Sequence, residues 1–153
     1  MNPPIDEKYI RSFLKNNKLA VLSTVNKNGL PDAAPIYFIA EDNFDFFFVV
    51  PEKTQKNINL KLQNDVVLTI TDEKKTETVQ VRGKAYNNEE KSLQNILKKL
   101  AEKLNSEENF ITSLPLLQYK DQEKIIVKVK PYEIRMRRYS EDGLDEKKIE
   151  IAE

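Results

Sequence analysis

Apolar residues recur with two different periods along the chain, and these periods predict a few short helices among many strands. Residues 4–16 and 89–104 carry apolar side chains at helical spacing, with polar residues on the opposite face. Shorter helices are predicted at 54–63 and around 107–113. Alternating or continuous apolar runs predict strands at 19–25, 32–40, 44–50, 66–71, 77–86, 124–130 and 132–139.

Turn signals between these runs predict that most strands are joined as antiparallel hairpins, such as the one closed by Asn28-Gly29. Pro35 lies inside the second strand and lacks the N–H that a ladder needs. It therefore marks a sheet edge, a bulge or a place where something other than a strand meets the backbone. Pro131 is expected to interrupt the strands near the C-terminus.

The pattern as a whole predicts a mainly β fold, a small antiparallel barrel with helices packed at its ends. We expect a single domain over residues 1–139. Residues 140–153 form a charged tail, for which partial disorder is expected.

Composition excludes several partners. The 25 basic and 25 acidic residues give a net charge of zero, so no global field favours nucleic acid or an anionic membrane. No apolar run is long enough to span a bilayer. The N-terminus lacks the features of a secretory signal, so a cytoplasmic location is expected.

Composition also limits the chemistry, because the chain contains no cysteine and no histidine. Disulfides, thiolate metal sites, cysteine nucleophiles and a Ser–His–Asp triad are excluded, and the commonest zinc ligand is missing. No metal site is predicted. Catalysis by this chain would have to use a bound cofactor, carboxylates, lysine or tyrosine.

The segment Pro51–Leu62 follows an apolar, phenylalanine-rich strand and opens a predicted helix. Thr54 is the expected hydroxyl cap of that helix, and Lys53 and Lys56 flank its first turn. A helix N-terminus presents unpaired N–H groups and the positive end of the helix dipole. With a hydroxyl and two ammonium groups added, it predicts a phosphate-binding seat. An ordinary helix start with surface lysines is the alternative.

The order of hairpin, strand, helix and hairpin, with the residues in it, resembles the pyridoxamine 5'-phosphate oxidase-like FMN-binding split-barrel family. The resemblance covers residues 5–88 well and 124–139 more loosely. No single piece is specific, whereas the ordered series at these intervals is. The matching pieces are Leu19–Val25 with Asn28-Gly29, Pro31, Pro35–Phe38, Phe46–Val50, Thr54–Lys56 with Asn59-Leu60, and Val81–Ala85.

This resemblance implies a six-stranded antiparallel split barrel that forms a homodimer, with two FMN sites at the subunit interface. In the family a Ser/Thr-x-Lys element after the third strand holds the phosphate. Here that element is Thr54, Gln55 and Lys56, and Lys53 lies directly before it.

The resemblance also implies where the flavin ring would lie, along the second strand and the end of the third. The ring-contacting residues would be Pro35, Ile36, Tyr37, Phe38, Val49 and Val50. The partner subunit would contribute the strand around Thr78, Gln80 and Arg82.

Three positions depart from the family pattern. The authentic oxidase has an arginine, a lysine and a hydroxyl where this chain has Ala34, Ile39 and Val50. Its substrate-binding histidine also has no counterpart, so this chain is not expected to be the vitamin B6 enzyme. FMN remains the expected cofactor, with deazaflavin F420 as the alternative. Heme is disfavoured, because its axial ligand is usually histidine.

The leading hypothesis is therefore an FMN-dependent oxidoreductase that acts on an unknown small molecule, without a catalytic residue that can be named. The alternatives are a non-catalytic flavin or F420 carrier and a structural dimer that has lost the cofactor. The missing polar groups at Ala34 and Val50 favour the structural dimer.

Overall fold

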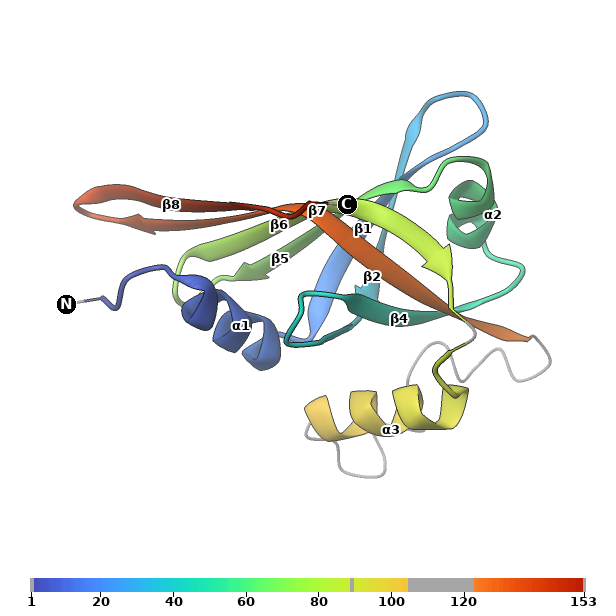
Figure 1. The fold of residues 1–153 in the computed structure, drawn as a ribbon. Coiled ribbons are helices and arrows are strands. Elements are labelled where there is room, and N and C mark those ends of the chain that lie inside the picture. Colours follow the sequence, from blue (N-terminus) through green and yellow to red (C-terminus); the bar gives the residue numbers. More distant parts are fainter. Residues whose placement is uncertain (1, 89, 105–122, 153) are drawn as a thin grey trace.

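The computed structural model describes residues 2–88, 90–104 and 123–152 of the chain. These residues form a curved antiparallel sheet with helices packed against it (Figure 1). The helical piece predicted around 107–113 lies outside the described residues. The elements are α1 (Glu7–Asn16), β1 (Leu19–Val25), β2 (Pro31–Tyr37), β3 (Ile39–Ala40), β4 (Phe46–Pro51), α2 (Gln55–Leu62), β5 (Asp65–Asp72), β6 (Glu77–Asn87), α3 (Leu93–Lys103), β7 (Lys124–Ser140) and β8 (Gly143–Glu150).

The sheet closes on itself through one bent strand. Its strand order is β2-β1-β5-β6-β7-β4-β3, with β8 paired to β7. The two ends of this order, β2 and β3, are separated in the chain by Phe38 alone. Phe38 is fully buried, and its N–H donates to the carbonyl of Lys18 at 3.3 Å. The predicted fold class, a mainly β split barrel with peripheral helices, is confirmed, with eight strands in the described residues where six were expected.

Pro35 lies on an edge strand, which is one of the three alternatives that its position predicts. β2 pairs with β1 on one side, where Pro35 lies opposite Val21. Because β2 stands at the end of the strand order, a residue without an N–H is tolerated on it.

Strand β7 continues through Pro131, so the predicted interruption is wrong. The register between β6 and β7 shifts after Arg82, and Gly83 pairs with Pro131. Such a bulge breaks the ladder locally, where a proline costs little. A Cβ at Gly83 would lie 2.7 Å from the carbonyl oxygen of Lys130, so the two backbones can approach this closely only because the residue is glycine.

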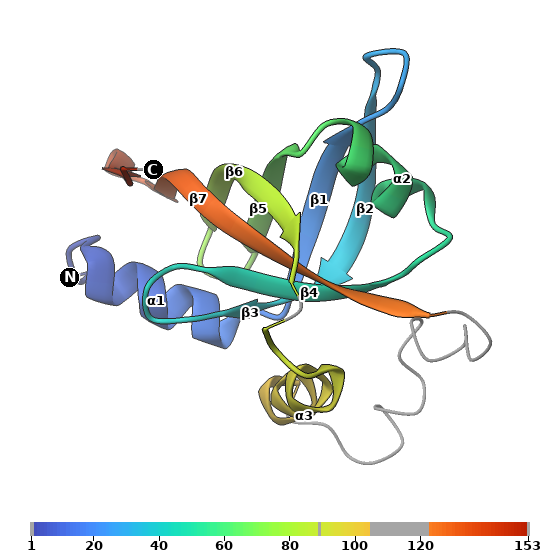
Figure 2. The same cartoon turned by 45° about the vertical axis from the view of Figure 1, so that its right-hand side comes forward.

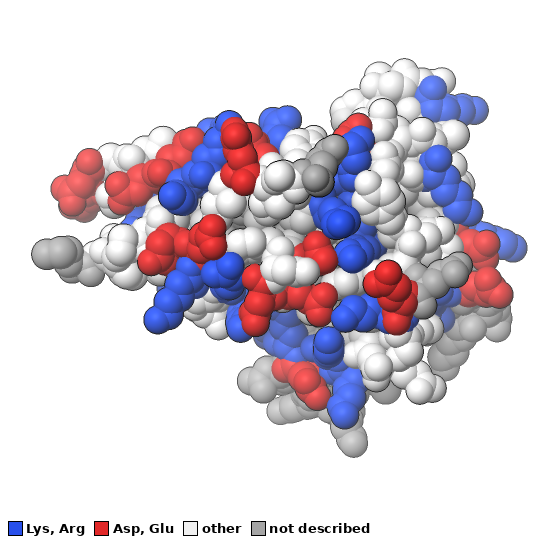
Figure 3. Space-filling view, viewed as in Figure 1, with Lys and Arg blue, Asp and Glu red and all other residues white. Residues whose placement is uncertain are grey.

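Residues 143–150 form the strand β8, which pairs antiparallel with β7. They belong to the charged tail, for which partial disorder was expected. The β7–β8 hairpin extends away from the barrel (Figure 1). Ion pairs cross it, including Arg137 with Glu146 at 2.9 Å and Lys148 with Glu133 at 3.2 Å. Basic and acidic side chains accordingly alternate along this hairpin (Figure 3). The strand contains few apolar residues, so its hydrophobic pattern did not predict it.

The strand β4 is buried over its whole length because both of its faces are covered. Phe46, Phe48 and Val50 belong to the cluster inside the barrel. Phe47 and Val49 belong to a second cluster, formed with α3 against the outside of the sheet (Figure 2). This explains why the sequence there is continuously apolar rather than alternating.

The turn before β4 is longer than predicted, since the strand begins at Phe46 and not at Phe44. Asn43 Oδ1 accepts a hydrogen bond from the Asp45 N–H at 3.0 Å, and Phe44 has a φ of 69°. These residues therefore form a turn. Phe44 belongs to the core through its side chain and is not part of the strand. None of the described helices is long and apolar enough to cross a membrane.

Candidate functional site

Helix α2 begins where the sequence predicts, directly after Thr54, but its cap differs from the prediction. The Thr54 hydroxyl donates to the carbonyl of Pro51 at 2.9 Å, and no side-chain cap hydrogen bond closes the first turn. The predicted hydroxyl cap is therefore wrong. The first N–H groups of α2 are left for another acceptor, and they carry the positive end of the helix dipole.

Lys56 lies in this first turn and is partly buried. Burial lowers the pKa of Lys56 below the usual value for lysine, because the ammonium loses part of its hydration. Within the described residues, no ion pair offsets this loss. Lys53 is exposed and Gln55 opens the helix, so the candidate phosphate residues 53–56 are adjacent around one helix start.

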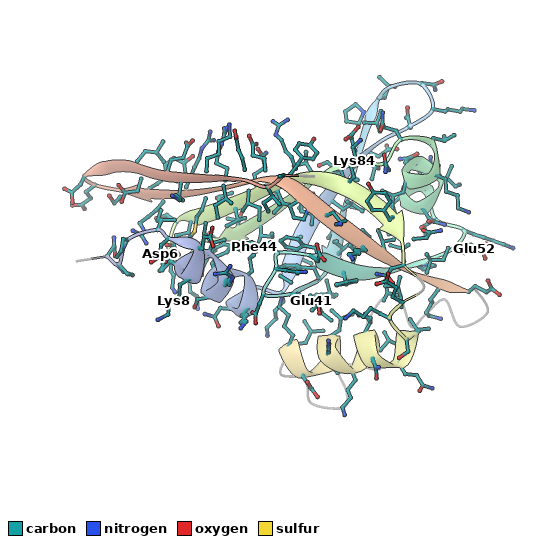
Figure 4. All side chains as sticks on the ribbon, in the orientation of Figure 1. Asp6, Lys8, Glu41, Phe44, Glu52 and Lys84 are labelled. Atoms are coloured by element: carbon teal, nitrogen blue, oxygen red, sulfur yellow. The ribbon has the colours of Figure 1, made fainter. Side chains whose placement is uncertain are left out.

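Two buried asparagines fix this helix start. Asn57 Nδ2 donates at 2.8 Å to the carbonyl of Glu52, which lies between β4 and α2 and is labelled in Figure 4. Asn59 Nδ2 donates to Asp32 Oδ2 at 2.8 Å, which ties α2 to the β1–β2 hairpin. The exposed fractions of Asn57 and Asn59 are 1% and 0%. Asn57 Oδ1 is buried and has no hydrogen-bond partner in the part of the chain that the structure describes.

The predicted ring-contacting residues of β2 alternate between its two faces. Ile36 is buried in the barrel, while Pro35 is exposed and Tyr37 is half-buried. Phe38, at the corner, is fully buried. Pro35 and Tyr37 lie opposite Val21 and Leu19 on β1, so these side chains share the outer face of the sheet.

The other predicted ring contacts, Val49 and Val50, are both buried, Val49 beneath α3 and Val50 inside the barrel. Their side chains are therefore not on the described surface of the protomer. Of the three departures from the family pattern, Ile39 and Val50 are buried and Ala34 is half-buried.

Gln80 and Arg82 lie on the outer face of β6, separated from β2 by β1 and β5. Gln80 lies opposite Thr69 of β5, and Arg82 forms an ion pair with Glu133 at 3.3 Å. A single protomer therefore does not bring these two residues to Lys56. The candidate residues form two groups, one at α2 and β2 and one on β6.

The residues that sequence reasoning missed are Asn57, Asp32 and Thr24, and it assigned no role to Asn59. One signal was present, since asparagine is a poor helix former and two of them occur in the eight residues of α2. The contact with Asp32 spans 27 residues, which no local pattern shows.

A surface cavity of about 350 Å³ lies at the opposite end of α2 from Lys56 and contains none of the candidate residues. It is lined by Leu60, Lys61, Leu62, Gln63, Asn64, Ala85, Tyr86, Asn87 and Val127. No cluster of acidic residues that could hold a metal ion occurs among the described residues.

The sequence model of a family described as pyridoxamine 5'-phosphate oxidase matches residues 6–138, which include the barrel, α2 and α3. The chain belongs to the pyridoxamine 5'-phosphate oxidase-like family. The match begins just before α1 and ends within β7, so the strands and helix that form both groups of candidate residues lie inside the family region. The search of curated proteins found no match to this chain.

Solved structures support the same fold. An F420 reductase has a TM-score of 0.66 and 20% identity, covering 81% of this chain and 94% of its own. General Stress Protein 26 from Bacillus anthracis has a TM-score of 0.67 and 17% identity, covering 95% and 98%. HutZ, a heme storage protein from Vibrio cholerae, has a TM-score of 0.59 and 16% identity, covering 82% and 89%. At these identities the likeness establishes the split barrel and leaves the ligand open.

Proposed function

We propose that this protein binds FMN and that the N-terminus of α2 holds the phosphate. The observation that carries the proposal is Lys56, a partly buried ammonium without an ion-pair partner among the described residues, beside uncapped helix N–H groups. A desolvated cation is unfavourable unless an anion joins it. A phosphate supplies that anion and accepts hydrogen bonds from the helix.

A buried amide in the same turn keeps the helix start in place. Asn57 Nδ2 donates to the Glu52 carbonyl at 2.8 Å, which fixes the amide in this orientation. Asn57 Oδ1 is shielded from solvent and has no hydrogen-bond partner among the described residues. The contacts proposed for the ligand at this turn are therefore those of its phosphate with Lys56 and the helix N–H groups.

The outer face of β2 and β1 suits the flavin ring and a second copy of the chain. Leu19 and Val21 are 49% and 41% exposed, and they lie beside Tyr37 and Pro35. Exposed apolar patches of this kind mark binding surfaces. We propose a homodimer in which the partner covers this face and supplies its own Gln80 and Arg82, which one protomer alone keeps away from α2.

The proposed activity is that of an oxidoreductase with a small-molecule substrate. When bound, FMN supplies hydride or electron transfer. The chain itself would hold the phosphate at Lys56, orient the ring along β2 and exclude water from the apolar outer face. The absence of histidine and cysteine is compatible with this proposal, because the cofactor supplies the redox chemistry and the protein needs no nucleophile of its own.

A non-catalytic carrier of a flavin or of F420 is the second candidate. It is favoured by the apolar residues at Ala34, Ile39 and Val50, two of which are buried and none of which can bind a phosphate. Fewer polar contacts predict a lower affinity for FMN than in relatives that have polar side chains at all three positions.

Mass spectrometry of the small molecule that co-purifies with the full chain tests this proposal. FMN, with flavin absorbance, is the expected result, whereas F420 would support the second candidate. Bleaching by NADH or NADPH without oxygen, with turnover of an acceptor, would separate an enzyme from a carrier. A colourless protein that takes up neither cofactor would contradict both candidates.

A further inference from the structure

We propose that Asn59 is a positioning residue for the phosphate seat and that it acts by tying the first turn of α2 to Asp32 of the β1–β2 hairpin. The inference rests on the proposed function, because it assigns a role within the same site. It concerns residues that do not contact the ligand themselves.

The amide of Asn59 is fully buried, and its Nδ2 and its Oδ1 both form hydrogen bonds with protein side chains. Its Nδ2 donates to Asp32 Oδ2 at 2.8 Å and to Thr24 Oγ1 at 3.0 Å. Its Oδ1 accepts from Gln55 Nε2 at 2.8 Å. A carboxylate can only accept, so Asp32 fixes which side of the amide faces the hairpin, and Oδ1 must face Gln55.

This arrangement connects the hairpin to the residue directly before Lys56. Thr24 and Asp32 are cross-strand partners on β1 and β2, so they form a rigid base. Gln55 is the first residue of α2. A shift of the helix start relative to the hairpin would therefore break a hydrogen bond of a fully buried amide, which costs more than breaking one in water.

The helix needs such an anchor, because its own sequence stabilises the first turn poorly. α2 has eight residues, no side-chain cap and no acidic residue in its first turn. Isolated helices of this length are marginal in water. A buried leucine at position 59 would contribute more to packing but would leave the first turn without its connection to Asp32. The amide therefore serves to hold Lys56 and the helix N–H groups in place.

The test compares FMN with riboflavin, which has the same ring and ribityl chain without the phosphate. Titrations use the full-length chain and the variant Asp32→Ala, which removes the carboxylate at a half-buried position of the hairpin. Asn59→Leu is the second variant. Asp72→Ala is the matched control, because Asp72 is also a half-buried aspartate but lies at the far end of β5.

We expect Asp32→Ala and Asn59→Leu to weaken FMN binding about tenfold and riboflavin binding much less, since only FMN uses the seat. Amide exchange of the unliganded protein at Ile58, whose N–H donates to the Thr54 carbonyl at 3.1 Å, should accelerate in both variants and not in Asp72→Ala. An equal loss for both ligands, or no loss, would overturn the positioning role. Wild-type protein that binds neither ligand would instead overturn the proposed function, and this inference with it.

Discussion

Lys103 of α3 places its Nζ 3.6 Å from the centroid of the Phe38 ring and donates a hydrogen bond to the Phe38 carbonyl at 2.9 Å. The helix is thereby joined to the residue at which the bent strand turns from β2 into β3. The ring and the carbonyl favour the ammonium, whereas burial opposes it. Burial prevails and lowers the pKa of Lys103 to about 7.

The lowered pKa of Lys103 predicts a stability that rises with pH. Between about 7 and the ordinary lysine value of 10.5, the folded protein binds fewer protons at this group than the unfolded chain does. The contribution of this group to the free energy of unfolding should therefore increase across this window, by at most about 1.4 kcal/mol per pH unit, and be flat below it.

Urea unfolding at several pH values, from below 7 to above 9, measures this effect as the difference between wild type and Lys103→Met. The exposed Lys99, on the same helix, provides the control variant Lys99→Met, which should keep the wild-type slope. A Lys103→Met protein with the same pH slope as wild type would show that Lys103 titrates normally.

The buried ion pair between Glu77 and Arg138 predicts a large loss of stability when one partner is neutralised. Their exposed fractions are 2% and 4%, and Arg138 Nε lies 3.1 Å from Glu77 Oε2, to which the Tyr9 hydroxyl also donates. Glu77→Gln should lower the free energy of unfolding by about 3 kcal/mol, because it leaves the buried guanidinium with only the exposed carboxylate of Asp145, 3.8 Å away.

The control for this prediction is Glu146→Gln, which removes the ion pairs of a surface carboxylate with Arg137 at 2.9 Å and with Arg135 at 3.5 Å. Exposed pairs contribute little, so we expect a change of about 0.5 kcal/mol or less. Denaturant unfolding measures both variants. Similar losses of the free energy of unfolding would show that burial does not increase the contribution of the Glu77 ion pair to stability.

The bulge at Pro131 predicts that Gly83 cannot be replaced. An added Cβ would meet the Lys130 carbonyl oxygen at 2.7 Å and Val129 Cγ1 at 2.9 Å, and the backbone atom cannot yield easily. Gly83→Ala should therefore destabilise the protein by about 2 kcal/mol or more. Gly29→Ala, in an open turn with a φ of 78°, should cost only about 1 kcal/mol. Thermal unfolding that ranks Gly29→Ala as the more damaging change would refute the close approach.

Local sequence was sufficient for the parts of the fold that depend on neighbouring residues. The start of α2 after Thr54 and the strand β1 follow from turn chemistry and periodicity. The edge position of Pro35 is one of the three alternatives that its missing N–H left open. The ordered series of these pieces also identified the family. The strand β8 escaped prediction because ion pairs and the ladder to β7, rather than an apolar face, define it.

The candidate site was predicted less completely, because its supporting contacts are distant in sequence. Asn59 and Asp32 are 27 residues apart, and Lys103 and Phe38 are 65 apart. The direction of the Thr54 hydroxyl also depends on the bend at Pro51, which a sequence motif does not encode. Residue types therefore predict a phosphate seat at the start of α2, whereas the side chains that position this helix start are visible only in the fold.

The central claim is that Lys56 and the start of α2 hold a cofactor phosphate. It is tested most directly by titrating FMN into wild type, Lys56→Ala and the control Lys61→Ala, whose lysine is exposed in the last turn of the same helix. Loss of a charge-assisted hydrogen bond should weaken FMN binding about 10- to 100-fold in Lys56→Ala and leave Lys61→Ala close to wild type. Equal FMN affinity in wild type and Lys56→Ala would contradict the account.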